Sequence, residues 1–203
     1  GHGLSDKPED PNAYGIEMVH DIARLMDHLN IPKAYIMGYS MGGFITLKFI
    51  TMYPERVIKA IAGGAGFEKP NGENIKILME LVESLEKGKG YYPLTKALEP
   101  GRKEPPIWKV KLIDFFINQF SDTKAMANVM KKFLDLQISE ESLKNNKVPL
   151  LVIVGTKDPL KAGAEALEKI VSNGKVVYLK NKDHGMALLS PKYIKTVLEF
   201  LRS

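Results

Sequence analysis

Two short apolar runs with a helical segment between them constrain the fold of this chain most. Residues 34–38 and 57–62 have the length and apolar character of buried strands, and glycines close both runs. Residues 41–53 between them carry apolar side chains at helical spacing, and Pro54 ends that pattern. A strand, a helix and a strand in this order predict a right-handed parallel crossover.

The same alternation returns near the C-terminal end of the chain. Residues 148–154 are almost all apolar, as expected for a strand that is covered on both faces. A helix at 162–171, a strand at 175–179 and a final helix at 191–201 follow. With the amphipathic helix expected at 16–29, these elements predict an α/β fold with a mostly parallel sheet flanked by helices.

The middle of the chain, residues 67–147, has a different character. Helical patterns occur near 73–87, 108–120 and 123–136, and we find no convincing strand there. An all-helical insertion within a parallel α/β layer predicts a cap over the sheet edge. We therefore expect an α/β core in two parts, residues 1–66 and 148–203, separated by a helical cap at 67–147.

Composition excludes several classes of function. The 203 residues include no cysteine, which removes disulfides, thiol nucleophiles and thiolate metal sites. The net charge of +5 comes from 29 basic and 24 acidic residues, but the lysines are scattered singly, so we expect no nucleic-acid partner. No run approaches the ~18 apolar residues of a membrane helix, so we expect no membrane span.

A serine lies between the first strand and its helix, in the motif Gly38-Tyr39-Ser40-Met41-Gly42. In this position the pattern is typical of a nucleophile elbow, a turn so tight that small residues are needed on both sides of the serine. The backbone N–H of Met41 would face the same space and could stabilise an oxyanion. The motif therefore indicates Ser40 as a nucleophile, while a glycine-rich turn needed only for close packing is the structural alternative.

A serine nucleophile needs a general base, and the candidates are His2, His20, His28 and His184. The first three lie in the opening loop or on the first helix, where we interpret them as ordinary residues. His184 follows the strand at 175–179, and in a parallel sheet this places it at the same edge as Ser40. We therefore expect His184 to be the base.

The base in turn needs an acid that orients it. Asp158 follows the strand at 148–154 and so reaches the same edge of the sheet. Asp183 is a rival, but neighbouring residues on a backbone rarely present their side chains to each other in the required way. The chain order is then Ser40, Asp158 and His184: nucleophile, acid and base.

With these motifs the chain resembles the α/β-hydrolase superfamily, in the helical-cap branch that contains small esterases and carbon–carbon-bond hydrolases. The likeness extends nearly from end to end, through Gly1–Pro8, the elbow, the helical middle, Gly155–Asp158 and Asp183–Gly185. It implies the roles given above for Ser40, Asp158 and His184. The chemistry of such a triad requires no metal and no organic cofactor, and we expect none.

The sequence departs from the family at its beginning. Members normally start with further strands and a His-Gly loop that donates the second N–H of the oxyanion hole. His2-Gly3 fits a later loop instead, because only one helix separates it from the strand at 34–38. We therefore expect the N-terminal strands of a longer hydrolase, or a companion chain, to be missing from this sequence, unless it is a reduced natural variant. The second oxyanion donor is not identified.

The leading hypothesis is a serine hydrolase that cleaves a small carboxylic ester through an acyl-enzyme on Ser40. A serine rather than an aspartate at this position argues against the dehalogenase and epoxide-hydrolase branches. An amide, a thioester or a carbon–carbon bond is left open as the target. A non-catalytic ligand-binding member of the fold, or a fragment without independent function, are the alternatives. The oligomeric state is also open, and the cytoplasm is favoured as the location.

Overall fold

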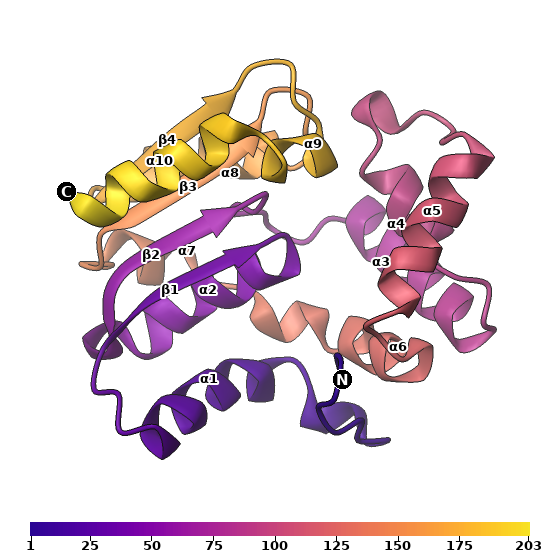
Figure 1. Cartoon of the computed structure of the whole chain (residues 1–203), viewed down its shortest axis with the longest axis horizontal. Helices are drawn as coiled ribbons and strands as arrows, with labels where there is room; N and C mark the ends of the chain where they lie inside the picture. Colours follow the sequence, from indigo (N-terminus) through magenta and orange to yellow (C-terminus); the bar gives the residue numbers. More distant parts are fainter. The chain divides into compact units, whose positions relative to one another are not determined.

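The chain is organised into two compact units. A computed structural model describes residues 1–203, apart from the side chain of Arg102 (Figure 1). Residues Val19–Glu68 and Leu136–Ser203 form one unit, here called the sheet unit. Residues Gly1–Met18 and Lys69–Asp135 form the other, the helical unit. The division into a core at 1–66 and 148–203 and a cap at 67–147 stays a prediction. In the structure, residues 1–18 belong to the same unit as the helices of the middle segment.

The sheet unit is built on parallel strands in the spatial order β1-β2-β3-β4. Their bounds are Ala34–Tyr39 for β1, Val57–Gly63 for β2, Leu150–Gly155 for β3 and Gly174–Leu179 for β4. Each neighbouring pair is parallel, and the last residue of β1, Tyr39, pairs with the last of β2, Gly63. The predicted parallel α/β fold is therefore confirmed.

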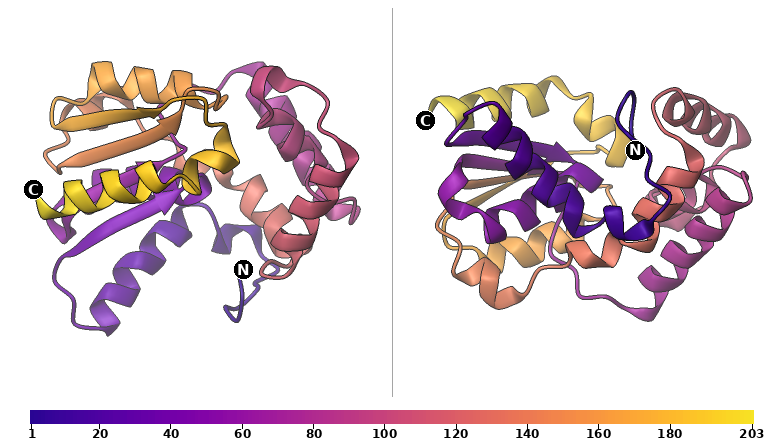
Figure 2. Two further views of the ribbon diagram at one scale, coloured as in Figure 1. Left: turned by 45° about the horizontal axis from the view of Figure 1, so that its top comes forward. Right: turned by 90° about the horizontal axis from the view of Figure 1, so that it is seen from below.

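Helices cover both faces of this sheet. Helix α2 (Met41–Met52) connects β1 to β2, and α8 (Lys161–Ile170) connects β3 to β4. Two right-handed crossovers that advance in the same direction across a sheet place their helices on the same face. Helix α10 (Pro191–Arg202) covers the other face, and Figure 2 shows it on the opposite side of the strands from α8.

One hydrophobic cluster in the core of the sheet unit lies between α10 and the two central strands. Tyr193 and Val197 of α10 pack with Ile61 of β2 and with Leu151 and Ile153 of β3. Every residue of β3 is buried, which explains why its sequence is an apolar run rather than an alternating one. Strand β3, which leads to Asp158, is thus fixed by burial on both faces.

Local signals set the ends of the remaining helices of the sheet unit. Helix α7 (Glu140–Lys144) begins at Ser139, whose side chain accepts the N–H of Ser142. Helix α9 (His184–Leu188) begins in the same way at Asp183. Helix α1 (Ile16–His28) is amphipathic and crosses the border between the units.

The helical unit contains α3 (Gly72–Glu86), α4 (Tyr92–Ala97), α5 (Ile107–Asn118) and α6 (Thr123–Lys131). Helix α3 packs against both α4 and α6. The opening residues join this unit through a short antiparallel bridge between His2 and Ser121, and Asn128 donates to the carbonyl of Glu9 over 3.0 Å.

Two helix boundaries in this unit differ from the sequence prediction. Helix α4 lies outside the helical segments predicted for this part of the chain, and Pro93 lies in its first turn, where the missing N–H of a proline costs nothing. The helix expected at 123–136 ends at Lys131, and a 3₁₀ turn (Phe133–Leu136) follows. Within the described residues, we find no helix with the length and apolar character needed to cross a membrane.

The burial of β3 yields a stability prediction. Leu151 is fully buried, and Leu151→Ala should lower the free energy of unfolding by about 2–5 kcal/mol, because lost transfer energy and a new cavity add together. Ile194→Ala on α10, where the side chain is 58% exposed, is the control and should change it by less than ~0.5 kcal/mol. Urea denaturation measures both, and equal losses would contradict this description of the core.

Candidate active site

Ser40 occupies a strained turn between β1 and α2. Its φ of 54° and ψ of −119° lie in a region that residues with a side chain rarely adopt. The turn is held from both sides: the N–H of Ser40 donates to the carbonyl of Gly63 over 2.8 Å, and the carbonyl of Ser40 accepts from the N–H groups of Gly43 and Phe44. The serine is therefore fixed to the end of β2 as well as to its own helix.

The glycines around the serine are required to different degrees. A Cβ on Gly38 would lie 2.0 Å from the carbonyl oxygen of Gly42, and one on Gly43 would lie 2.7 Å from Cβ of Ala65. A Cβ on Gly42 would meet nothing within 4 Å among the described residues. The requirement for small residues thus applies to Gly38 and Gly43 rather than to the second glycine of the motif.

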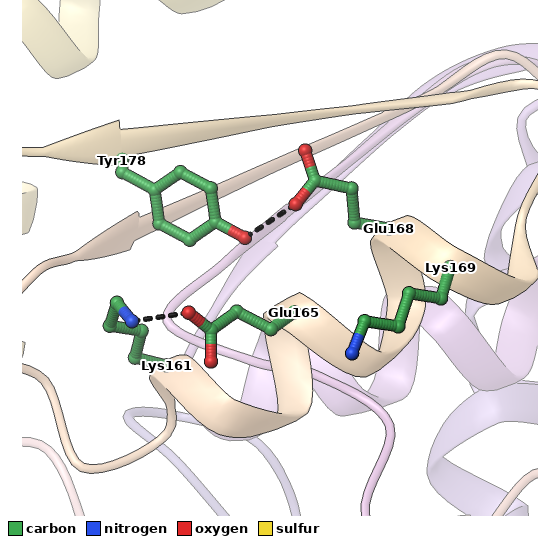
Figure 3. Close-up of a pocket in the computed structure, with 5 residues that line it drawn as sticks. All are labelled: Lys161, Glu165, Glu168, Lys169 and Tyr178. Atoms are coloured by element: carbon green, nitrogen blue, oxygen red, sulfur yellow. Dashed lines mark hydrogen bonds and ion pairs between the residues drawn. The ribbon is translucent and has the colours of Figure 1, made fainter.

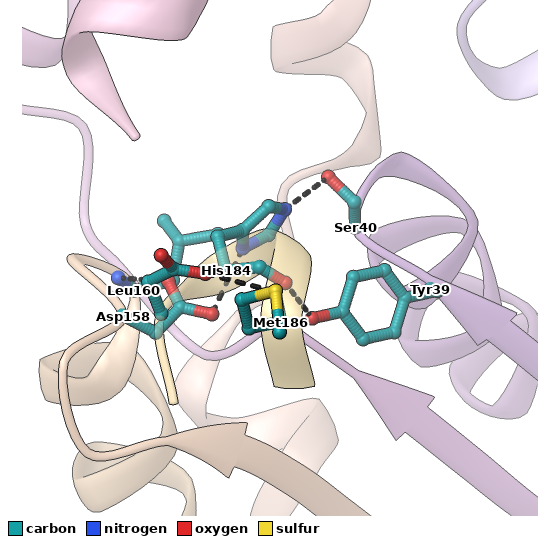
Figure 4. Close-up of polar contacts among 7 residues, drawn as sticks. Tyr39, Ser40, Asp158, Leu160, His184 and Met186 are labelled. Carbon is teal, nitrogen blue, oxygen red and sulfur yellow. Dashed lines mark hydrogen bonds and ion pairs between the residues drawn. The ribbon is translucent and has the colours of Figure 1, made fainter. Parts of the chain in front are cut away.

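Asp158 and His184 reach Ser40 from beyond the ends of β3 and β4, as Figure 4 shows. Nε2 of His184 lies 3.0 Å from Oγ of Ser40, and Nδ1 of His184 lies 2.8 Å from Oδ2 of Asp158. His184 and Asp158 are both buried. If Nδ1 donates its proton to the carboxylate, Nε2 is left to accept the proton of the serine hydroxyl. The structure therefore brings the three residues into one hydrogen-bonded row.

Asp158 has a partner for each of its carboxylate oxygens. Oδ1 accepts the N–H of Leu160 over 2.9 Å, while Oδ2 faces His184. A buried carboxylate without such partners would be costly, so these bonds keep Asp158 in place and in one orientation.

The loops that carry the acid and the base are tied to each other. The N–H of Lys157 donates to the carbonyl of Lys182 over 2.9 Å, and the N–H of Asn181 donates to Oγ1 of Thr156 over 2.8 Å. Gly155 allows this approach, because a Cβ there would lie 2.1 Å from the carbonyl oxygen of Lys182. The distance between Asp158 and His184 is thus set by backbone contacts.

Asp183, the rival acid, has a different role in the structure. Its Oδ1 accepts the N–H of Met186 over 2.8 Å and so caps the short helix α9. His184 is the first residue of that helix. Its position directly after a predicted strand had suggested a loop instead. The aspartate next to the histidine therefore helps to start the helix that presents it.

The other histidines lie elsewhere. His20 contacts the hydroxyl of Tyr53 through Nδ1 at 2.6 Å, and His28 lies in the last turn of α1. His2 belongs to the helical unit, where burial, aided by the positive N-terminus, lowers its pKa. No group of three or more residues suited to hold a metal ion occurs among the described residues.

Comparison with known proteins agrees with the fold described above. A family model described as the alpha/beta hydrolase fold matches residues 1–94. The chain is 27% identical to 3-oxoadipate enol-lactonase 2 of Acinetobacter baylyi, over 81% of this chain and 61% of the relative. A solved alpha/beta hydrolase enzyme, MGS-M2 from a deep-sea metagenome library of the Medee basin, matches with a TM-score of 0.82 at 24% identity, over 99% of this chain and 76% of that one.

The chain has the α/β-hydrolase fold. A further relative is 2-hydroxy-6-oxononadienedioate/2-hydroxy-6-oxononatrienedioate hydrolase of Burkholderia vietnamiensis, 27% identical over 89% of this chain and 66% of the relative. The chain thus spans less than two thirds of the length of both of these curated relatives.

In this fold, Met41 is the first residue of α2. The first N–H groups of a helix have no partner within the helix, and they carry the positive end of its dipole. Next to Ser40, such a donor is suited to an oxyanion, which is the basis of the role expected for Met41.

A surface recess of about 410 Å³ lies on α8 and β4, where Lys161, Glu165, Glu168, Lys169 and Tyr178 line it (Figure 3). Lys161 pairs with Glu165, and the hydroxyl of Tyr178 donates to Glu168 over 2.8 Å. None of the three residues of the hydrogen-bonded row lines this recess.

The unequal glycines of the turn at Ser40 can be tested by a matched pair of variants. Gly38→Ala should lower the free energy of unfolding by about 3 kcal/mol, because its Cβ overlaps backbone that cannot give way. Gly42→Ala should leave stability unchanged or raise it by up to ~1 kcal/mol, since alanine favours a helix. Chemical denaturation checks both, and a larger loss for Gly42→Ala would refute this description of the turn.

Proposed function

We propose that this protein is a serine hydrolase that cleaves a small carboxylic ester through an acyl-enzyme on Ser40. The observation that supports it best is the row of hydrogen bonds from Asp158 through His184 to Ser40. A strained serine at the N-terminal end of a helix adds to it. The enol-lactonase among the relatives acts on a lactone, which is itself an ester.

In the first half of the reaction, Oγ of Ser40 attacks the ester carbonyl while Nε2 of His184 takes its proton. The negative charge that forms on the carbonyl oxygen is stabilised by the N–H of Met41. Asp158 holds the imidazole and stabilises its positive charge. His184 then returns the proton to the leaving alkoxide, and the alcohol departs.

In the second half, a water molecule attacks the acyl-enzyme. His184 accepts a proton from this water, and the tetrahedral intermediate collapses with release of the acid. The proton returns to Oγ of Ser40, so the enzyme ends in its starting state. No step requires a metal or an organic cofactor.

The second candidate rests on the hydrolase of Burkholderia vietnamiensis, because the dienedioate in its name contains no ester bond. Hydrolysis of such a compound would break a carbon–carbon bond, which a serine of this kind also supports. Turnover of a vinylogous 1,5-diketone with no turnover of simple esters would favour this reaction over ester hydrolysis. A non-catalytic ligand-binding role would instead leave Ser40 unlabelled by a fluorophosphonate.

The nucleophile is tested with a fluorophosphonate probe and intact-mass spectrometry. The wild-type chain should gain a single adduct, and Ser40→Ala should gain none. Hydrolysis of p-nitrophenyl acetate should fall by about 10³-fold or more in Ser40→Ala. An adduct that persists in Ser40→Ala would refute the assignment of the nucleophile.

The acid is tested by two matched substitutions. Asp158→Asn should lower the rate of ester hydrolysis by about 10²–10⁴-fold, since the amide would no longer stabilise the imidazolium or its tautomer. Asp183→Asn should keep the rate within about threefold of wild type, because asparagine caps a helix as well as aspartate does. Steady-state assays measure both variants, and the reverse order of losses would make Asp183 the acid.

A further inference from the structure

Tyr39, the residue directly before Ser40, contacts the histidine in two ways. Its hydroxyl donates to the backbone carbonyl of His184. Its ring also lies beside the imidazole, with ring centroids 5.3 Å apart and planes tilted by 48°. Figure 4 shows Tyr39 reaching from the end of β1 to the helix that carries His184. Tyr39 is not itself part of the row of hydrogen bonds from Asp158 through His184 to Ser40.

The surroundings of Tyr39 are shaped to hold its ring. Tyr193 of α10 packs edge-on against it, with centroids 5.8 Å apart. A Cβ on Gly63 would lie 2.6 Å from the Tyr39 ring, and a Cβ on Gly64 would lie 2.9 Å from both Tyr39 and His184. The two glycines that end β2 therefore make room for the tyrosine and the imidazole together.

The hydroxyl of Tyr39 remains a donor over the ordinary range of pH. Burial raises the pKa of Tyr39 well above its usual value, and the charge of Asp158 acts in the same direction. The phenol is thus neutral wherever a hydrolase of this kind works, so its bond to the carbonyl of His184 persists.

Helix α9, which carries His184, is short and needs contacts from outside to stay in place. Helix α9 has only 5 residues, and a helix of this length is not stable by itself. Asp183 caps its N–H groups at the start, whereas Tyr39 holds the carbonyl of its first residue from across the sheet edge. The end of β1 therefore carries Ser40 and, through the hydroxyl of Tyr39, also contacts the residue expected to be the base.

We propose that Tyr39 is a positioning residue that sets the distance and orientation of His184 relative to Ser40. This inference rests on the proposed serine hydrolase function. Loss of the hydroxyl bond would let α9 shift and would lengthen the contact between Nε2 and Oγ. Substrate binding would be affected little, because the hydroxyl of Tyr39 is directed to the backbone of His184 and not to Ser40.

The test compares Tyr39→Phe with Tyr193→Phe in the full chain. Tyr193→Phe is a matched control, because the hydroxyl of Tyr193 is buried and has no hydrogen-bond partner among the described residues. Tyr39→Phe should lower kcat for p-nitrophenyl acetate, and the rate of fluorophosphonate labelling, by about five- to tenfold, as expected for one hydrogen bond. KM should change by less than about twofold, and Tyr193→Phe should leave all of these values unchanged.

Tyr39→Leu, which also removes the ring contact with His184, should lose more activity than Tyr39→Phe. The temperature of unfolding is measured for each variant, so that rates are compared for folded protein. The inference would be overturned if both Tyr39 variants kept the wild-type kcat and labelling rate. It would also be overturned by equal losses in Tyr39→Phe and Tyr193→Phe, or by a change in KM alone. A wild-type chain that does not label at Ser40 would instead contradict the proposed function, so the two failures are distinguishable.

Discussion

The hydrogen bond from the N–H of Ser40 to the carbonyl of Gly63 is the interaction on which the rest of the site depends. A positive φ at a serine costs on the order of 1–3 kcal/mol and persists only where the surroundings offset it. Here the offset comes from the end of β2, which pairs in register with the end of β1. The position of the nucleophile is therefore a consequence of strand pairing, and the buried core between β2, β3 and α10 keeps that pairing in place.

The base and the acid depend on the same sheet in a different way. Ser40 and His184 are 144 residues apart in sequence, yet the carboxyl ends of β1 and β4 place them at one edge. Contacts between the two loops, such as the one from Lys157 to Lys182, hold the acid against the base. Glycines at close approaches, Gly38 and Gly155 among them, allow these backbones to meet. The geometry is thus set mainly by backbone, with few side chains added.

The α/β-hydrolase fold defines the framework of this protein, whereas the proposed reaction depends on the residues of the site. The relatives that it resembles include an enol-lactonase and a hydrolase of a dienedioate, which are named for different substrates. The residues near Ser40 are a strained serine at the start of a helix and a buried histidine and aspartate joined to it by hydrogen bonds. The proposed ester hydrolysis needs no further group, and the hydroxyl of Tyr39 bonds to the backbone carbonyl of His184.

The sequence by itself determined the order of strands and helices, the parallel sheet and the candidates Ser40, Asp158 and His184. These follow from local signals: apolar runs, helical spacing and turn residues at the ends of strands. Only the tertiary structure decided that Asp183 caps a helix, that Gly42 is free of steric contact while Gly38 is not, that Pro93 starts a helix, and that Tyr39 bonds to His184. The physical reason is that each of these depends on which atoms lie opposite one another in space, and no pattern along the chain records that.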